Sequence, residues 1–169
     1  LEQERAGIGF FFGYFMFIFI FMYGVQVMRG VMEEKQNRVV VRWDGDHRFD
    51  ASRLGSQHAI RIDADATTGP GPVDTLLSAL ASCTAVDIVD ILAKRRTPVE
   101  GLTIDVHGER ASSTPARLTR VMLTYRMRGA GIERQHAERA IELSVTKYCS
   151  VRDSLDPAMP VEWALELET

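Results

Sequence analysis

Cysteine and histidine are scarce in this chain. Its 169 residues include two cysteines, Cys83 and Cys149, and four histidines. A structural zinc site needs about four nitrogen or sulfur ligands at short spacings, and no C-x-x-C or H-x-x-x-H pair occurs here. The sequence therefore predicts no metal site and no disulfide framework. Two thiols in an otherwise cysteine-poor chain fit a reducing compartment, where they are either buried or functional.

The chain also lacks a strong excess of either charge. Its formal net charge is −3, so the overall balance predicts no nucleic-acid partner. A chain of 169 residues is long enough for one domain with its own core and a short appendage.

Phenylalanine is nearly absent from most of the chain. Residues 1–38 hold seven of the eight phenylalanines, whereas residues 39–169 hold fourteen arginines and only two lysines. This shift in composition predicts two regions of different origin, a hydrophobic segment at 1–38 and a folded domain at 39–169.

The hydrophobic segment has the length of a membrane span. Residues 6–28 carry no charge, and 23 helical residues cross a hydrocarbon core of about 30 Å. Basic residues follow the span at Arg29, Lys35, Arg38 and Arg42. We therefore expect membrane contact through residues 6–28 and a cytoplasmic domain after them.

Residues 1–40 also resemble a fragment of an ABC-type exporter permease, in which a membrane helix precedes a charged segment similar to MRGVMEEKQNR. A single helix cannot form a transport pathway, because such pathways lie between helices. Three interpretations stay open: a natural membrane anchor, a fusion of unrelated reading frames, or an assembly artefact.

Alternating hydrophobicity marks strands in the domain. Such strands are predicted at residues 39–43, 58–62, 102–106, 121–127 and 161–167. We expect half-buried antiparallel sheets. Helices are predicted from Pro72 to about Arg95, where Pro98 prevents continuation, and from about Glu133 to Tyr148. The fold class is α+β, with the cysteines on two central helices.

Each of the two cysteines lies within a distinctive sequence motif. They are Pro72, Asp74, Leu76, Leu77, Ala79, Cys83, Ala85, Asp87, Ile88, Val89, Ile91 and Leu92, followed by Lys147, Tyr148, Cys149, Ser150 and Val151. With the order of elements, they resemble the OsmC/Ohr family of thiol-dependent hydroperoxide reductases over residues 38–169. The resemblance implies an OsmC-like fold and an interlocked homodimer with active sites at the subunit interface.

The resemblance also implies a chemistry. Cys83 would be the peroxidatic cysteine, which attacks an organic hydroperoxide and becomes a sulfenic acid, and Cys149 would resolve it as a disulfide. An external dithiol would then reduce the disulfide, with no metal or bound organic cofactor. The family's activating arginine and acidic residue correspond best to Arg48 and Asp74, with Arg53 and Arg61 as rivals for the arginine.

Two acidic residues weigh against a reactive Cys83. Asp87 and Asp90 follow it by four and seven positions on the same helical face, and a nearby carboxylate raises the pKa of a thiol. The alternative is a non-catalytic OsmC-like module that binds a ligand, in which the cysteines fill core volume.

Overall fold

The computed structural model describes residues 36–168. The predicted transmembrane helix at 6–28, and most of the segment that resembles a permease, lie outside these residues. Residues 41–52 and 56–169 form one compact unit, and residues 1–40 with 53–55 belong to another.

Three short strands form one sheet in the order β1-β2-β3. They are β1 (Val39–Trp43), β2 (Arg48–Arg53) and β3 (Ile60–Asp63), and β2 pairs with β3 in antiparallel register. β1 agrees with the predicted strand at 39–43, whereas β3 begins two residues later than predicted. β2 was missed because its sequence, RFDASR, has little apolar character.

Helix α2 (Pro72–Lys94) begins and ends as the sequence predicts. Pro72 occupies the first turn, where its missing N–H costs no hydrogen bond. Leu80, Ile88 and Leu92 are fully buried on one face, and each such side chain contributes about 1.5–3 kcal/mol by leaving water. The face of α2 that packs on the mixed sheet is buried within one chain, as expected for a central helix. Elsewhere on its surface α2 exposes three large apolar side chains, Leu76, Val86 and Val89.

A second sheet contains β4 (Gly101–Arg110), β5 (Leu118–Arg128) and β6 (Val161–Glu168), in that order. β4 and β5 are antiparallel, but β5 and β6 are parallel, so the prediction of purely antiparallel sheets is corrected to a mixed sheet. The reason is the helical connection between β5 and β6, which returns the chain to the end from which β5 started.

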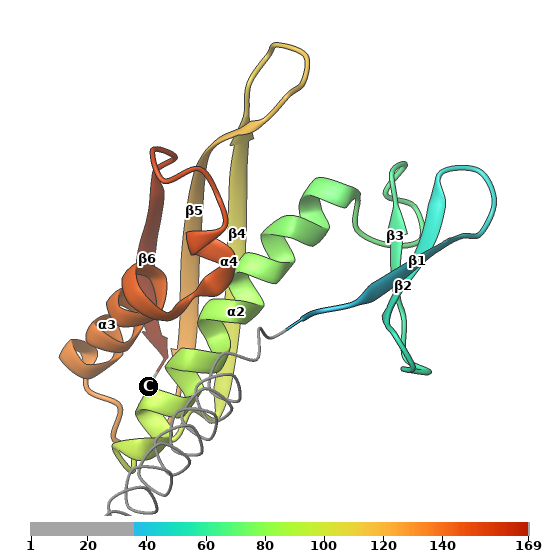
Figure 1. Ribbon diagram of the computed structural model, residues 1–169. Helices are drawn as coiled ribbons and strands as arrows, with labels where there is room; N and C mark the ends of the chain where they lie inside the picture. Colours follow the sequence, from blue (N-terminus) through green and yellow to red (C-terminus); the bar gives the residue numbers. More distant parts are fainter. Residues whose placement is uncertain (1–35, 169) are drawn as a thin grey trace, which may run out of the picture. The chain divides into compact units, whose positions relative to one another are not determined.

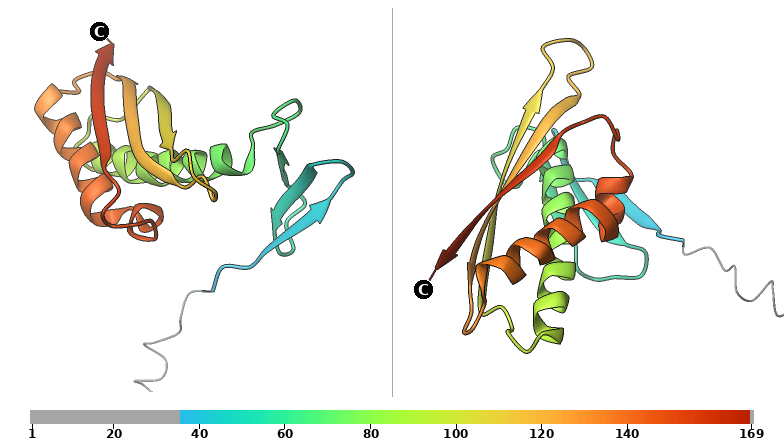
Figure 2. Two further views of the ribbon diagram at one scale, coloured as in Figure 1. Left: turned by 90° about the horizontal axis from the view of Figure 1, so that it is seen from above. Right: turned by 90° about the vertical axis from the view of Figure 1, so that its left-hand side faces the viewer.

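Helices α2 and α3 (Arg134–Leu143) cover the same face of this sheet (Figures 1 and 2). The sheet turns alternate residues of β5 toward them, and all four are fully buried: Val121, Leu123, Tyr125 and Met127. The α+β class is therefore confirmed, with the main core between the mixed sheet and its two helices.

The second predicted helix, which was expected to carry Cys149, is not one continuous α-helix. α3 ends at Leu143, a π-helical turn follows over Ser144–Tyr148, and Cys149 is the N-cap of a four-residue helix, α4 (Ser150–Asp153). Tyr148 is exposed rather than directed into the core. The spacing of apolar residues predicted a continuous α-helix, because the one extra residue in the π turn hardly changes that spacing.

Within the described residues, α2 alone is long and apolar enough to meet a length and composition criterion for a membrane span. The same helix packs against the mixed sheet and supplies part of the core. The central helix of a globular domain commonly meets this criterion, so α2 gives only weak support for a membrane span.

Candidate functional site

The two cysteines lie on different kinds of backbone. Cys83 is near the middle of α2 and is half-buried, whereas Cys149 caps α4 and is 3% exposed. Both thiols are free. Since α2 packs against the π turn and α4, the fold brings together two residues that are far apart in the sequence.

The two thiols lie close enough to influence each other. A negative charge on Cys83 disfavours ionisation of Cys149 and helps to raise the pKa of the Cys149 thiol. An intramolecular disulfide also requires the two cysteines to be neighbours. The sequence could suggest this pairing only through the family resemblance.

Burial and the neighbouring Cys83 together raise the pKa of the Cys149 thiol to about 11, against the hydrogen bonds from the backbone, which lower it. The Arg152 N–H donates to Cys149 Sγ at 3.3 Å and favours the thiolate, but it does not outweigh the burial. Cys149 is therefore protonated at neutral pH. A thiolate that reacts first with a peroxide cannot come from this residue in appreciable amount.

The π turn fixes the position of Cys149 through the backbone. The Cys149 N–H donates to the Ser144 carbonyl oxygen at 2.9 Å, and the Cys149 carbonyl accepts from the Asp153 N–H at 3.1 Å. Turns of this kind occur frequently at functional sites because they redirect the chain without ending the helix. Here the turn directs Cys149 toward α2.

A buried polar network joins α2, β5 and the π turn. The Tyr125 hydroxyl donates to Thr84 Oγ1 at 2.9 Å, and the Thr84 hydroxyl donates to the Ala81 carbonyl at 2.8 Å. The Ser144 hydroxyl donates to the Thr84 carbonyl at 2.9 Å. Buried polar groups stabilise a fold only when they are hydrogen-bonded, so this network fixes the π turn beside Cys83.

Tyr125 is part of the electrostatic environment of the cysteines. Burial raises the pKa of its hydroxyl to about 12, and the negative charge of an ionised Cys149 adds to the increase, against the Thr84 hydrogen bond. Thr84, Tyr125 and Ser144 are site residues that no sequence pattern marks as such. A tyrosine in an alternating strand indicates a core position, and only its need for a hydrogen-bond partner could have singled it out.

Asp87 and Asp90, the two carboxylates that follow Cys83 on α2, differ in their surroundings. Asp87 Oδ2 lies 3.2 Å from the Ser144 hydroxyl, so Asp87 belongs to the polar network beside the cysteines. Asp90 is exposed to solvent. Water screens the charge of Asp90, and Asp87 is the carboxylate that remains relevant to Cys83.

The three candidate arginines are also distinguishable. Arg61 forms ion pairs with Asp44 and Asp50 at 2.8 Å each, and Arg53 is exposed at the end of β2. Arg48 donates from Nη2 to Asp46 at 2.8 Å, while its buried Nε has no hydrogen-bond partner among the described residues. A buried N–H without a partner is rare, so Arg48 retains a donor that another group could satisfy.

Asp74 has a role at the start of α2. Its Oδ2 accepts the Gly71 N–H at 3.0 Å, and a carboxylate in the first turn is also favoured by the helix dipole. Nine residues of helix separate it from Cys83, a rise of about 13 Å. Within one chain Asp74 therefore acts as a helix-capping residue.

The described part of the chain contains no cluster of three or more histidine, cysteine, aspartate or glutamate residues with the geometry to hold a metal ion. His47 pairs with Asp65, and His136 lies against Arg95 and Glu133. The chemistry that this site offers comes from its two thiols.

Comparison with known proteins gives a consistent result. The sequence profile described as OsmC-like protein matches residues 63–164, which include both cysteines. Protein YhfA of Escherichia coli K12 is 31% identical over 113 residues, covering 66% of this chain and 84% of YhfA.

Solved structures show the same fold. A hypothetical protein of Aquifex aeolicus is 26% identical with a TM-score of 0.68, covering 80% of this chain and 99% of that protein. The organic hydroperoxide resistance protein OhrB of Bacillus subtilis is 14% identical with a TM-score of 0.52, covering 79% and 98%. The profile match leaves residues 1–40 outside, so the resemblance of that segment to a permease has no support from it.

Proposed function

Because the chain belongs to the family of OsmC-like proteins, we propose that it reduces organic hydroperoxides with Cys83 and Cys149. The observation that supports this most strongly is that the packing of α2 against the π turn and α4 brings two free thiols from distant parts of the chain close together. A fold shared with a protein described as an organic hydroperoxide resistance protein adds to the proposal.

The burial of the two thiols supports the assignment of their roles. Cys83 is the more exposed thiol and attacks the hydroperoxide; its sulfur takes one oxygen and the alcohol leaves with the other. Cys149 then attacks the sulfenic acid on Cys83, a disulfide forms, and the proton of Cys149 departs with the hydroxyl as water. Its raised pKa disfavours Cys149 as the first nucleophile but allows this second step, in which the proton has an acceptor.

An external dithiol completes the cycle. It supplies two electrons, becomes a disulfide itself, and returns both cysteines to thiols. The net reaction consumes one hydroperoxide and one dithiol and yields an alcohol, water and the oxidised dithiol. No step requires a metal or a bound organic cofactor.

We also propose a homodimer. The exposed face of α2 carries Leu76, Val86 and Val89, and β1 exposes Val41 and Trp43, which are 57% and 69% accessible in one chain. Burial of such apolar surfaces is a common reason for obligate association. In a dimer that pairs these surfaces, Arg48 of the strand region would place a cation near Cys83, and its unpartnered Nε would gain a partner.

The proposed location is the cytoplasm, where reduced thiols persist. Expression of residues 39–169 alone tests whether the hydrophobic segment is required. We expect a folded and active fragment, and loss of activity without that segment would favour a natural membrane anchor.

The function is tested by following consumption of cumene hydroperoxide with dithiothreitol as reductant. We expect catalytic turnover, with hydrogen peroxide reduced more slowly because Cys83 also packs against the apolar core, which favours an organic substrate. If excess cumene hydroperoxide produces neither turnover nor a change in free thiols, the proposed reaction is wrong. That result would favour the alternative of a ligand-binding module.

A further inference from the structure

Ser144 contacts both of the segments that carry a cysteine. Its hydroxyl donates to the carbonyl oxygen of Thr84, the residue that follows Cys83 on α2, at 2.9 Å. Its own carbonyl oxygen accepts the N–H of Cys149 at 2.9 Å. Ser144 is fully buried, so water does not compete for these bonds. One residue thus links the backbone beside Cys83 to the backbone of Cys149.

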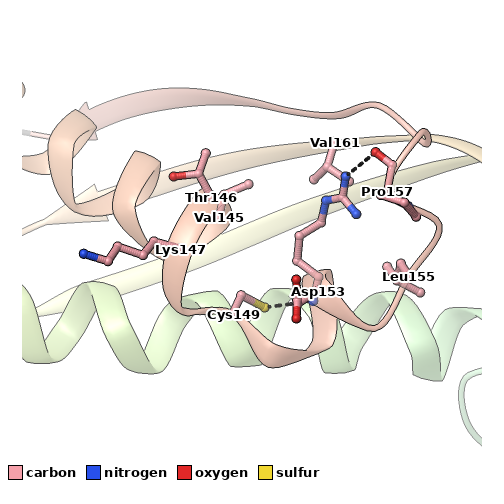
Figure 3. Close-up of a pocket in the computed structure, with 9 residues that line it drawn as sticks. Val145, Thr146, Lys147, Cys149, Asp153, Leu155, Pro157 and Val161 are labelled. Carbon is pink, nitrogen blue, oxygen red and sulfur yellow. Dashed lines mark hydrogen bonds between the residues drawn. The ribbon is translucent and has the colours of Figure 1, made fainter.

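The bond between Ser144 and Cys149 spans five residues, one more than in an α-helix. Each α-helical residue turns the chain by about 100°, so a regular helix would place Cys149 about 140° away from Ser144. A π turn closes its hydrogen bond from i to i+5 and brings these two residues nearly above one another. Because Ser144 faces α2, the π turn also brings Cys149 to the side of α2 (Figure 3).

Asp87 adds a second contact to this anchor. Its Oδ2 lies 3.2 Å from the Ser144 hydroxyl, and Asp87 stands about one helical turn beyond Cys83 on α2. The exposed hydroxyl of Thr146, in the same π turn, bonds instead to the Glu142 carbonyl within its own helix. Of these two hydroxyls in the π turn, that of Ser144 reaches α2 and that of Thr146 does not.

We propose that Ser144 is a positioning residue for the disulfide between Cys83 and Cys149. Its hydroxyl holds the first residue of the π turn on α2, and its carbonyl holds the Cys149 amide. Both bonds restrict the positions that Cys149 takes relative to Cys83, and so raise the effective concentration of one thiol at the other. The inference rests on the proposed function, because it concerns the second step of that cycle.

The positioning role is tested by equilibrating the protein with a glutathione redox buffer. Oxidised glutathione forms a mixed disulfide with one cysteine, the other cysteine displaces it, and two glutathione thiols are released. Mass spectrometry after alkylation gives the fraction of the Cys83–Cys149 disulfide, and hence the effective concentration. In Ser144→Ala we expect this concentration to fall about 3- to 10-fold, the range that the loss of one buried hydrogen bond can produce.

The direction of this change follows from the two redox states. Without the Ser144 hydroxyl the reduced π turn moves away from α2 part of the time, whereas the disulfide still requires Cys149 beside Cys83. The oxidised protein therefore loses more free energy than the reduced protein does. No fall in Ser144→Ala, or a wild-type protein that stops at mixed disulfides with glutathione, would overturn the proposal.

Two control variants separate positioning from stability. Thr146→Ala removes a hydroxyl from the same π turn that does not reach α2. Thr68→Val removes a hydrogen bond to the buried carboxylate of Asp63, in the loop before α2. Both should leave the effective concentration within about twofold of the wild type, although Thr68→Val should lower stability. A fall in either control as large as that in Ser144→Ala would contradict the specific role of Ser144.

Hydrogen exchange in the reduced wild-type protein tests the anchor without any substitution. The Cys149 N–H bonds to Ser144, whereas the Ser154 N–H bonds only within the short helix α4. We expect NMR to show the Cys149 amide exchanging at least about 10-fold more slowly than the Ser154 amide, because the anchor opens less often than a helix end. Similar exchange of the two amides would show that Ser144 does not hold Cys149.

Failure of the proposed function is a separate result. Thiols that resist cumene hydroperoxide would refute the hydroperoxide reaction, while the glutathione equilibrium would still decide the role of Ser144. If the hydroperoxide reaction works, the sulfenic acid on Cys83 should form at the wild-type rate in Ser144→Ala but persist about 3- to 10-fold longer. A dimedone probe measures this lifetime, and an unchanged lifetime would contradict the positioning role.

Discussion

The two cysteine regions differ in almost every physical property. Cys83 is half-buried on a regular helix, whereas Cys149 is nearly inaccessible at the junction of a π turn and a short helix. Cys149 is also protonated at neutral pH. The difference shows how one fold can give two chemically identical side chains different environments, and it is the basis of the different roles proposed for them.

Serine substitutions should separate these roles most strongly. Cys83→Ser removes the atom that attacks the hydroperoxide, so we expect a loss of turnover of about 100-fold or more. Cys149→Ser should keep the first oxidation at the wild-type rate but should leave Cys83 as a sulfenic acid, detectable with a dimedone probe. Equal loss of the first oxidation in both variants would contradict the division of roles.

Alkylation should show the same contrast in the unmodified protein. At pH 8 we expect iodoacetamide to label Cys83 about 100-fold faster than Cys149, because burial and a pKa of about 11 leave Cys149 little thiolate. Peptide mass spectrometry after short exposures gives both rates. In urea, where the protein is unfolded, the two cysteines should be labelled at similar rates. If Cys149 is labelled faster than Cys83 in the folded protein, Cys149 is not protected by burial.

The polar network should contribute to stability as well as position. Ser144→Ala removes a buried hydroxyl from the Thr84 carbonyl and from Asp87, and we expect a loss of about 1–3 kcal/mol in the free energy of unfolding. Ser82→Ala is the matched control, since Ser82 is exposed and bonds only within α2. Urea denaturation measures both variants, and equal small losses would show that the network does not anchor the π turn.

The smallest expected effect is a loss of stability at alkaline pH, caused by the buried Cys149 and Tyr125 side chains. In the folded protein the pKa of Cys149 is raised from 9.0 to about 11, and the pKa of Tyr125 is raised from 10.0 to about 12. Unfolding therefore releases protons above pH 9, and stability falls as pH rises. We expect the melting temperature to drop by several degrees between pH 9 and 11.

Two substitutions test whether Cys149 and Tyr125 cause the loss of stability at alkaline pH. Cys149→Ser should remove the part that begins near pH 9, and Tyr125→Phe should remove the part that begins near pH 10. Since the same groups are protonated in both states below pH 8, neither substitution should change the pH dependence there. A slope that persists in the double variant would assign the effect to other groups.

Much of the fold follows from local sequence signals. Pro72 and Pro98 bound α2 correctly, and alternating apolar residues located β4, β5 and β6. The direction of β6 could not be predicted, because alternation is the same in parallel and antiparallel strands. β2 escaped detection since Phe49 is its only large apolar residue.

The site was less predictable than the fold. The family resemblance identified Cys83 and Cys149, but apolar spacing cannot distinguish a π turn from a continuing α-helix. The contact of Tyr125 with Thr84 depends on the packing of β5 against α2, which no local pattern encodes. The roles of Arg48 and Asp74 remain predictions from the resemblance, and the proposed homodimer offers the setting in which they can be tested.

The most direct test of the account is the intact mass of the protein after one equivalent of cumene hydroperoxide. We predict that the wild type loses two hydrogen atoms and both free thiols, with Cys83 and Cys149 joined in one peptide pair. The Cys149→Ser variant should instead gain one oxygen atom. A wild-type protein that keeps both thiols, or that gains oxygen without forming the disulfide, would contradict the two-cysteine reaction.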